Sequence, residues 1–243
     1  MLFYKGWLET RVRFILCSIV LFVLCAYSVV QRLDNLRYAR RYVSYSNYIY
    51  WETYSSITCV VFVLCTLLLG LGGFLRERER GTIAVSLTIP VTRRRLVLTR
   101  AAVGLAETVL LACIPALTIC MLSPLVRESY PTAQAIKFGI LWVFAGMLYY
   151  SASFLGSTLL PGEYTAAAAS VLGFFVYSFL FGRMPALRPF NVNGIMSAHE
   201  APFLDKGTHL LIGPLPWAPL LIVASVAAAL LAVAVFVSER QDY

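Results

Sequence analysis

Six stretches of mostly apolar residues divide the chain, and each is long enough to form a helix across a membrane. About 20 such residues are needed to cross the hydrocarbon core. The stretches cover residues 14–30, 56–75, 96–121, 136–155, 165–181 and 218–237. No polar stretch between them is long enough to form a separate domain. We therefore predict an all-α membrane protein, with a single transmembrane domain over residues 1–243.

The residues before the first span mix apolar and charged side chains. Trp7 and Leu8 alternate with charged residues such as Lys5, Glu9 and Arg11. This pattern is typical of a short helix lying in the membrane interface, and a frayed tail is the alternative. The first span is longer than the apolar core of a signal peptide, and no small-x-small cleavage site follows it. We expect the span to be retained.

Composition supports a membrane protein. Hydrophobic residues make up 60% of the 243 residues and charged residues 13%, against about 45–50% and about 25% in soluble domains. This excludes a disordered chain and argues against a soluble domain. The net charge of +8 would suggest nucleic acid only if the basic residues shared one polar surface. Six arginines instead lie between the second and third spans, and we predict no nucleic-acid partner.

The arginines also predict orientation, because short cytoplasmic loops are rich in Lys and Arg. The second-to-third connection holds the densest cluster and should be cytoplasmic, which puts both termini in the cytoplasm. Four arginines in the first outer loop oppose this bias: Arg32, Arg37, Arg40 and Arg41.

Enzyme motifs are missing from the sequence. It has no Gly-x-x-x-x-Gly-Lys-Ser/Thr loop, so we expect no nucleotide hydrolysis and no bound cofactor on this chain. His199 and His209 are ten residues apart, which does not match a zinc-binding helix. All six cysteines lie in predicted spans, where a thiol behaves as a small apolar group. We predict no metal site.

The connection at 76–95 is the most informative segment. Alternating charges prolong the second span, Gly81 can end its helix, and Thr82 can cap a next one. The apolar run Ile83 to Ile89 then stops at Pro90. Its periodicity fits a strand or a helix. On physical grounds it is equally a docking surface for a partner or a basic loop that only fixes topology.

This run resembles the cytoplasmic segment in the permease subunits of type-2 ABC exporters. Their pattern has an acidic-basic tract, Gly-Thr, a short apolar helix, Pro-apolar-Ser/Thr-Arg, and a basic residue just inside the next span. The matching residues here are Glu77, Glu79, Gly81, Thr82, Ile83, Leu87, Pro90, Arg93 and Arg100. The chain departs from the pattern at Ala84, where the family often has Glu.

The resemblance implies an ATP-driven exporter. Residues 76–95 would hold a coupling helix that docks on a separate ABC ATPase, which binds ATP and Mg²⁺. Two ATPase copies and two permease chains, identical or different, would form the transporter in a bacterial inner membrane. The alternative is a permease-like subunit that transports nothing and transmits ATPase-driven motion to an extracytoplasmic partner.

Two further groups of residues are candidates for function. Arg100 and Glu107 are seven apart in the third span and share a helix face; an intramembrane charge indicates function by default, and an internal packing role is the alternative. Small residues in the fifth span let helices approach closely and suit either a dimer interface or packing within one chain. They are Ala166, Ala169, Ser170 and Gly173.

The segments outside the membrane carry weaker signals. We expect the three arginines at 93–95 to meet lipid phosphates or an acidic partner. The aromatic cluster around 38–54 is typical of the membrane interface. The Pro-rich connection at 182–217 is either a passive connector or a structured element, with residues 193–204 resembling the family's short re-entrant helices.

Overall fold

A computed structural model describes the chain over residues 2–34, 44–71, 92–160, 162–184, 191–199, 204–205 and 207–240. Within these ranges the regular elements are helices, and one isolated β-bridge joins Leu204 to Leu211. Six helical stretches are long and apolar enough to cross a membrane. The predicted all-α membrane fold is confirmed.

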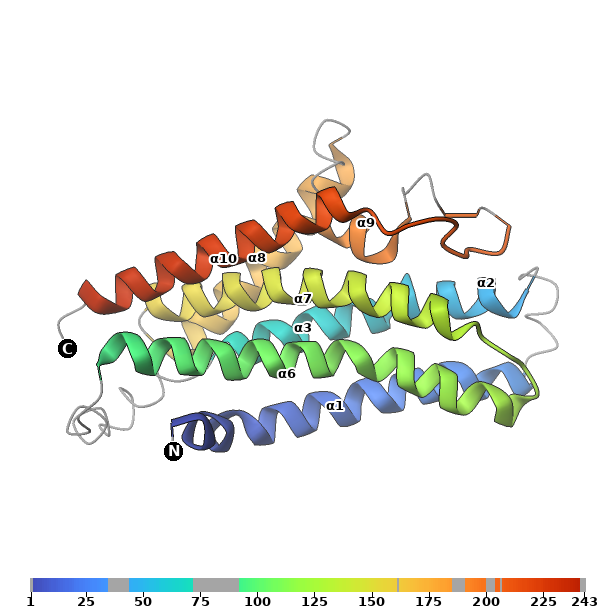
Figure 1. Cartoon of the computed structure of the whole chain (residues 1–243), viewed down its shortest axis with the longest axis horizontal. Coiled ribbons are helices and arrows are strands. Elements are labelled where there is room, and N and C mark those ends of the chain that lie inside the picture. Colours follow the sequence, from blue (N-terminus) through green and yellow to red (C-terminus); the bar gives the residue numbers. More distant parts are fainter. Residues whose placement is uncertain are drawn as a thin grey trace.

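The helices follow the predicted spans (Figure 1). Five spans are single helices: α1 (Leu2–Asp34), α6 (Arg93–Leu122), α7 (Thr132–Leu159), α8 (Glu163–Arg183) and α10 (Trp217–Arg240). The second span consists of α2 (Tyr45–Ile49), the π-helix η2 (Tyr50–Tyr54) and α3 (Ile57–Gly70). Two short helices complete the described chain, the 3₁₀-helix η3 (Ser123–Val126) and α9 (Val192–Ser197). The first turn of α1 and the last turn of α10 lie at the same end of the molecule, which we call the amino-terminal end. The opposite end is the distal end.

Helix α1 differs from the prediction at its beginning. The expected interfacial helix is not a separate element, because residues 2–34 form one continuous helix. The sequence contains no proline there, and Gly6 is the one glycine, so nothing local ends the helix before the span. Contacts from Glu9 and Thr10 to α6 also hold these first turns against the bundle.

The second span begins earlier than predicted, and its tyrosines are core residues. Tyr45, Tyr48, Tyr50 and Tyr54 are each at most 7% exposed, whereas the sequence suggested an aromatic cluster at the membrane interface. The Tyr48 hydroxyl donates to the Ser28 carbonyl oxygen over 2.6 Å, and the Tyr45 hydroxyl lies 2.7 Å from that of Ser123. A hydrogen-bond partner stabilises a buried phenol, and for Tyr48 and Tyr45 the partners lie on α1 and η3.

Helix α7 is the centre of the bundle. It packs against α3, α6, α8, α9 and α10. Its side chains Phe138 and Trp142 are fully buried against the second span. Phe138 stacks on Tyr54 with ring centroids 4.2 Å apart, and Trp142 lies 4.6 Å from the ring of Phe62. Each such pair contributes about 0.5–1.5 kcal/mol beyond its buried area.

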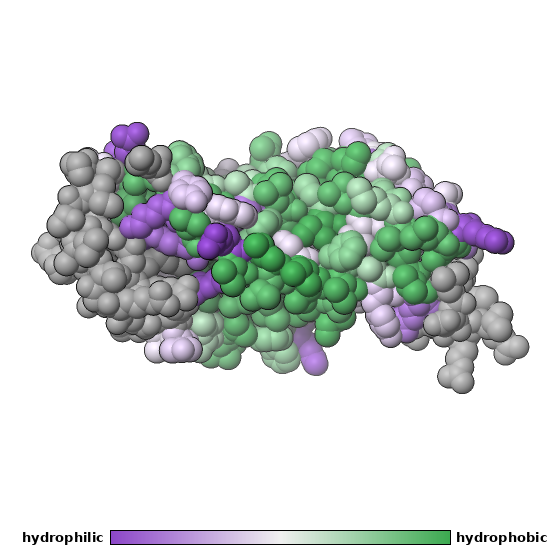
Figure 2. Space-filling model, turned by 90° about the horizontal axis from the view of Figure 1, so that it is seen from below, coloured by the Kyte–Doolittle hydropathy of each residue, from purple (hydrophilic) through white to green (hydrophobic). Residues whose placement is uncertain are grey.

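The bundle is apolar on its outer surface. Hydrophobic residues dominate the middle of the face shown in Figure 2, and hydrophilic residues lie toward the ends. On α1 the exposed apolar residues include Ile15, Leu16, Ile19, Val20, Phe22 and Val23. In water such a surface would drive association, so it is suited to lipid chains.

The distal end is closed by the chain between α9 and α10. The Gln134 side chain exchanges two hydrogen bonds with the Leu211 backbone, over 3.0 and 3.1 Å. The Lys137 ammonium donates to the carbonyl oxygens of Leu211 and Gly213. Helix α9 occupies the first part of the segment that resembles a re-entrant helix, and Val192 donates its backbone N–H to the Tyr177 hydroxyl over 2.8 Å.

Close packing of α3 on α7 predicts that Gly70→Ala destabilises the protein. A Cβ atom at Gly70 would lie 2.8 Å from the Tyr150 carbonyl oxygen and 2.7 Å from the Ser153 Cβ. Because backbone atoms cannot move aside easily, we expect a loss of about 1–3 kcal/mol, measured by denaturant titration in mixed micelles.

Gly182→Ala is the matched control, because Gly182 also lies near a helix C-terminus and nothing lies within 4 Å of its Cβ position. Equal stability of the two variants would contradict the close approach.

Candidate functional site

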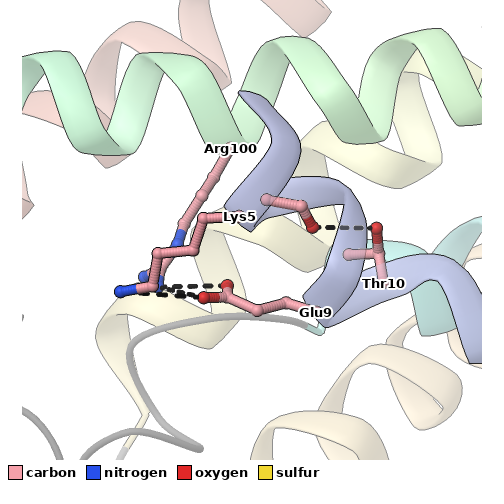
Figure 3. Close-up of polar contacts among 5 residues, drawn as sticks. Lys5, Glu9, Thr10 and Arg100 are labelled. Atoms are coloured by element: carbon pink, nitrogen blue, oxygen red, sulfur yellow. Dashed lines mark hydrogen bonds and ion pairs between the residues drawn. The ribbon is translucent and has the colours of Figure 1, made fainter. Parts of the chain in front are cut away.

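The charged residues of the third span face the beginning of α1. Helices α1 and α6 run side by side along the bundle (Figure 1), and their amino-terminal halves bring polar groups from both helices together (Figure 3). We call this group the α1–α6 cluster. It consists of Lys5, Glu9, Thr10 and Arg13 on α1 and of Arg100 and Glu107 on α6.

Arg100 is bound by an acidic residue of α1. Its guanidinium Nη2 lies 3.1 Å from one Glu9 carboxylate oxygen and 3.2 Å from the other. Lys5 lies 4.0 Å from the same carboxylate, one helical turn away (Figure 3). The Arg100 side chain is 7% exposed and that of Glu9 is 28% exposed. Removing one partner from a pair this buried is costly, because the other charge then lacks compensation.

Glu107 is bound by the next residue of α1. The Thr10 hydroxyl donates a hydrogen bond to Glu107 Oε1. Glu107 is 2% exposed, and its second oxygen, Oε2, is buried with no hydrogen-bond partner among the described residues. Arg100 and Glu107 therefore both face α1, and they share one helix face as their seven-residue spacing predicted. Their partners, Glu9 and Thr10, are consecutive residues of α1.

Arg13 extends the cluster to the end of α3. Its guanidinium Nη1 donates to the carbonyl oxygens of Leu68 and Leu71. Leu71 is the C-cap of α3, and α6 begins at Arg93. Helix α1 thus binds the two helices that border residues 72–91, on both sides of the predicted coupling segment.

A close contact behind Arg100 fixes α6 on the central helix. Tyr150 of α7 is 2% exposed, and its hydroxyl donates to the Arg100 carbonyl oxygen over 3.5 Å. A Cβ atom at Gly104 would lie within 2.5 Å of the Tyr150 ring. The ring can pack here because residue 104 has no side chain. The arginine side chain faces α1 while its backbone contacts α7.

The predicted coupling residues lie outside the described residues, except at the end of the segment. They are Glu77, Glu79, Gly81, Thr82, Ile83, Leu87 and Pro90. Arg93 is the first residue of α6, and Thr92 is its N-cap, although the Thr92 side chain makes no capping hydrogen bond.

The small residues of α8 face a groove within the chain. Ala166 is fully buried. Ala169, Ser170 and Gly173 line a groove of about 370 Å³ beside α7. The Ser170 hydroxyl lies 3.3 Å from that of Ser153 on α7. Ala166 and Ser170 therefore have neighbours in their own chain, whereas Ala169 and Gly173 are exposed. The dimer interface stays a prediction.

Both histidines gather at the distal end, which their sequence spacing did not suggest. His209 stacks on Tyr50 with ring centroids 4.5 Å apart, and the His199 Nδ1 lies 3.4 Å from the Tyr50 hydroxyl. Trp51 makes edge contacts with both imidazole rings. Among the described residues, no three His, Cys, Asp or Glu side chains lie close enough to hold a metal ion.

His209 is held in an unusual backbone conformation. Its φ is +54°, in the left-handed region. Asp205 accepts hydrogen bonds from the Thr208 hydroxyl and from the Thr208 and Gly207 amides. These bonds, the hydroxyl's above all, lower the pKa of Asp205. Burial lowers the pKa of His209 below its ordinary 6.5, and His199 lowers it further while Asp205 opposes the shift.

Comparison with known proteins identifies the family. The sequence pattern of the ABC-2 family of transporter proteins matches residues 7–194, which is more than half of the chain. The chain belongs to the ABC-2 transporter family. The matched region includes α6, most of α1 and every member of the α1–α6 cluster except Lys5. A search of curated proteins gives no match.

Membership confirms the predicted resemblance and makes the chain a multi-pass membrane subunit of an ABC-2 transporter. The membrane subunits of this family are not themselves catalytic, and they work with ABC ATPases. The cluster is therefore a candidate for passing movement between helices.

The hydrogen bond between Thr10 and Glu107 can be measured by a double-mutant cycle. We expect Thr10→Val and Glu107→Leu to be coupled by about 1 kcal/mol in unfolding free energy, within the range for bonds between helices in membranes. The measurement is denaturant titration of the four proteins in mixed micelles.

Thr99→Val is the control partner in the cycle, because the Thr99 hydroxyl donates to the Arg95 carbonyl oxygen of its own helix over 2.7 Å. A coupling energy of zero between Thr10→Val and Glu107→Leu would show that the bond contributes nothing.

The histidine pair predicts a loss of stability in mild acid. Because the pKa of His209 is lowered in the folded protein, the unfolded chain binds the proton more readily. The contribution of His209 to stability is therefore complete above pH 6.5 and decreases as the pH falls toward its lowered pKa. We expect a lower melting temperature at about pH 5.5 than at about pH 7.5.

His209→Asn should reduce this difference, because asparagine accepts a positive φ and does not titrate. Asp205 does not contribute to this difference, because its contribution to stability decreases only below pH 3.8. An unchanged pH dependence in His209→Asn would assign the effect to other groups.

Proposed function

We propose that the chain is the membrane subunit of an ATP-driven exporter. The observation that carries the proposal is the match to the ABC-2 transporter family over residues 7–194. Two copies of a separate ABC ATPase would bind ATP and Mg²⁺, and a second permease chain, identical or different, would complete the transporter. The membrane would be a bacterial inner membrane, with both chain termini in the cytoplasm.

The coupling helix in this proposal lies within residues 76–95. Glu77 and Glu79 would meet the ATPase, and the short apolar run from Ile83 would fill a groove on it. The dense arginines of this connection support a cytoplasmic location. The amino-terminal end of the bundle would then face the cytoplasm.

The α1–α6 cluster would pass the movement of the coupling helix to the spans. Arg13 binds the last residues of α3, while Glu9 and Thr10 bind α6. A displacement of the connection at 72–91 would reach α1 through both helices that border the connection, α3 and α6. ATP can drive such a change only by binding one conformation better than the other. Arg100 and Glu107 would serve as the α6 attachment points.

Co-purification tests the partner. The tagged chain is isolated from its native membrane, the proteins that co-purify with it are identified, and ATP hydrolysis is measured in the recovered complex. We expect Glu79→Lys to lower the recovered ATPase about tenfold, because a reversed charge at a docking surface is repelled by the partner.

Glu239→Lys is the matched control, because Glu239 lies at the amino-terminal end as well and forms an exposed pair with Arg94 over 3.9 Å. Such a pair contributes little. Purification of the chain without any ATPase would refute the proposal. An active complex that accumulates no compound in inverted vesicles would favour the non-transporting alternative.

A further inference from the structure

The surroundings of the Glu107 carboxyl group do not match a negative charge. The residue is 2% exposed, and its Oε2 is buried with no hydrogen-bond partner among the described residues. A carboxylate oxygen enclosed without a donor loses its hydration and gains no bond in return. A neutral carboxylic acid avoids most of this cost, because Oε2 is then an uncharged carbonyl oxygen.

Among the described residues, no ion pair compensates a charge on Glu107. Arg100, two turns before it on α6, is bound by Glu9 over 3.1 Å. Arg13 donates to carbonyl oxygens at the end of α3. Both neighbouring cations therefore have other acceptors, and Glu107 depends on the Thr10 hydroxyl.

The other ionisable groups around Glu107 do not supply a positive charge. Cys17 on α1 and Tyr150 on α7 are near enough to interact with it electrostatically, and Cys65 of α3 contacts Cys17. On α10 the acidic Glu239 lies at the amino-terminal end. A thiol or a phenol is either neutral or negative, so none of these groups favours a carboxylate at Glu107.

The two hydrogen bonds of the Thr10 side chain are satisfied together only if a further proton is present. The hydroxyl oxygen lies within hydrogen-bond distance of Glu107 Oε1 and, at 3.2 Å, of the Gly6 carbonyl oxygen. Both are acceptors when Glu107 is ionised, and a hydroxyl has one proton to donate. A proton on Glu107 reverses the donor of the first bond. The acid then donates to the Thr10 oxygen, and the Thr10 proton goes to Gly6.

We propose that Glu107 is a proton-binding site, which holds a proton while α1 is docked on α6 and releases it to water when the two helices separate. Separation removes the Thr10 hydroxyl and exposes the carboxyl group to water, where an ordinary glutamate is ionised at neutral pH. The acid loses one proton and leaves one carboxylate. Glu9, the residue before Thr10, is 28% exposed, so water reaches the border of the site.

The consequence is that movement of α1 on α6 is coupled to one proton. Because the docked state binds the additional proton, its stability decreases as the pH rises. This coupling depends on the contact between α1 and α6 and requires neither ATP nor the ATPase.

Infrared difference spectroscopy of the full chain in lipid nanodiscs tests for the proton. At about pH 7.5 an ordinary glutamate, with a pKa of about 4.3, is ionised. We expect the spectrum of the wild type minus that of Glu107→Gln to contain the C=O stretch of one neutral carboxyl group, shifted in D₂O. A carboxylate band in its place would overturn the proposal.

Glu239→Gln is the matched control, because Glu239 is exposed and pairs with Arg94 over 3.9 Å. This substitution should remove carboxylate bands only, and the C=O stretch of the neutral carboxyl group should remain.

A reversible crosslink between α1 and α6 tests the coupling to docking. A Cβ atom at Gly6 would lie 3.8 Å from the Val103 Cβ, a separation that suits a disulfide. Gly6→Cys combined with Val103→Cys should therefore hold α1 on α6, and mass spectrometry identifies the crosslinked peptides. As the pH is raised, we expect the neutral-carboxyl band to disappear about one pH unit higher in the crosslinked protein than after reduction. This is a tenfold change in proton affinity.

Equal behaviour of the crosslinked and reduced proteins would overturn the coupling. This comparison keeps the native Glu107, so it decides the proposal even if Glu107→Gln fails to fold. The exporter proposal is tested separately by ATPase recovery, so either proposal can fail without the other.

Discussion

The structure depends on one constraint, that a charge placed within a membrane helix must find its partner on another helix. An arginine or a glutamate near the hydrocarbon core costs several kcal/mol when unpartnered. Arg100 and Glu107 stand on the same face of α6, and consecutive residues of α1 supply a carboxylate and a hydroxyl to them. This determines the rotation of both helices about their axes and their relative height. It also makes the first turns of α1 part of the bundle.

The rest of the bundle is held together by packing of apolar side chains. Around α7 the contacts are aromatic and small-residue packing, from the Tyr54–Phe138 stack to the close approach at Gly70. Packing of this kind is short-ranged and resists small displacements. Helix α8 lacks it along much of its length and borders a groove instead. The molecule thus combines a rigid centre, a charged attachment at one edge and a loosely packed helix at another.

The sequence predicted the number, type and approximate bounds of the membrane helices, because each span is long and apolar. It also put Arg100 and Glu107 on one face, since that follows from helix geometry alone. It could not predict Glu9 and Thr10 as their partners, because tertiary contacts between helices are not encoded in local periodicity. The same limit explains the tyrosines of α2 and η2, whose burial depends on α1, η3 and α7. The proximity of His199 and His209 to Tyr50 had no signal in their spacing.

The length of α1 has a consequence for how the protein responds to its lipid environment. Its 33 residues extend about 50 Å, whereas the hydrocarbon core is about 30 Å thick. A change in bilayer thickness therefore alters the tilt of the whole helix and moves Glu9 and Arg13 relative to α6 and α3. Membrane thickness would therefore act on Glu9 and Arg13, the residues that connect α1 to α6 and α3 on either side of residues 72–91.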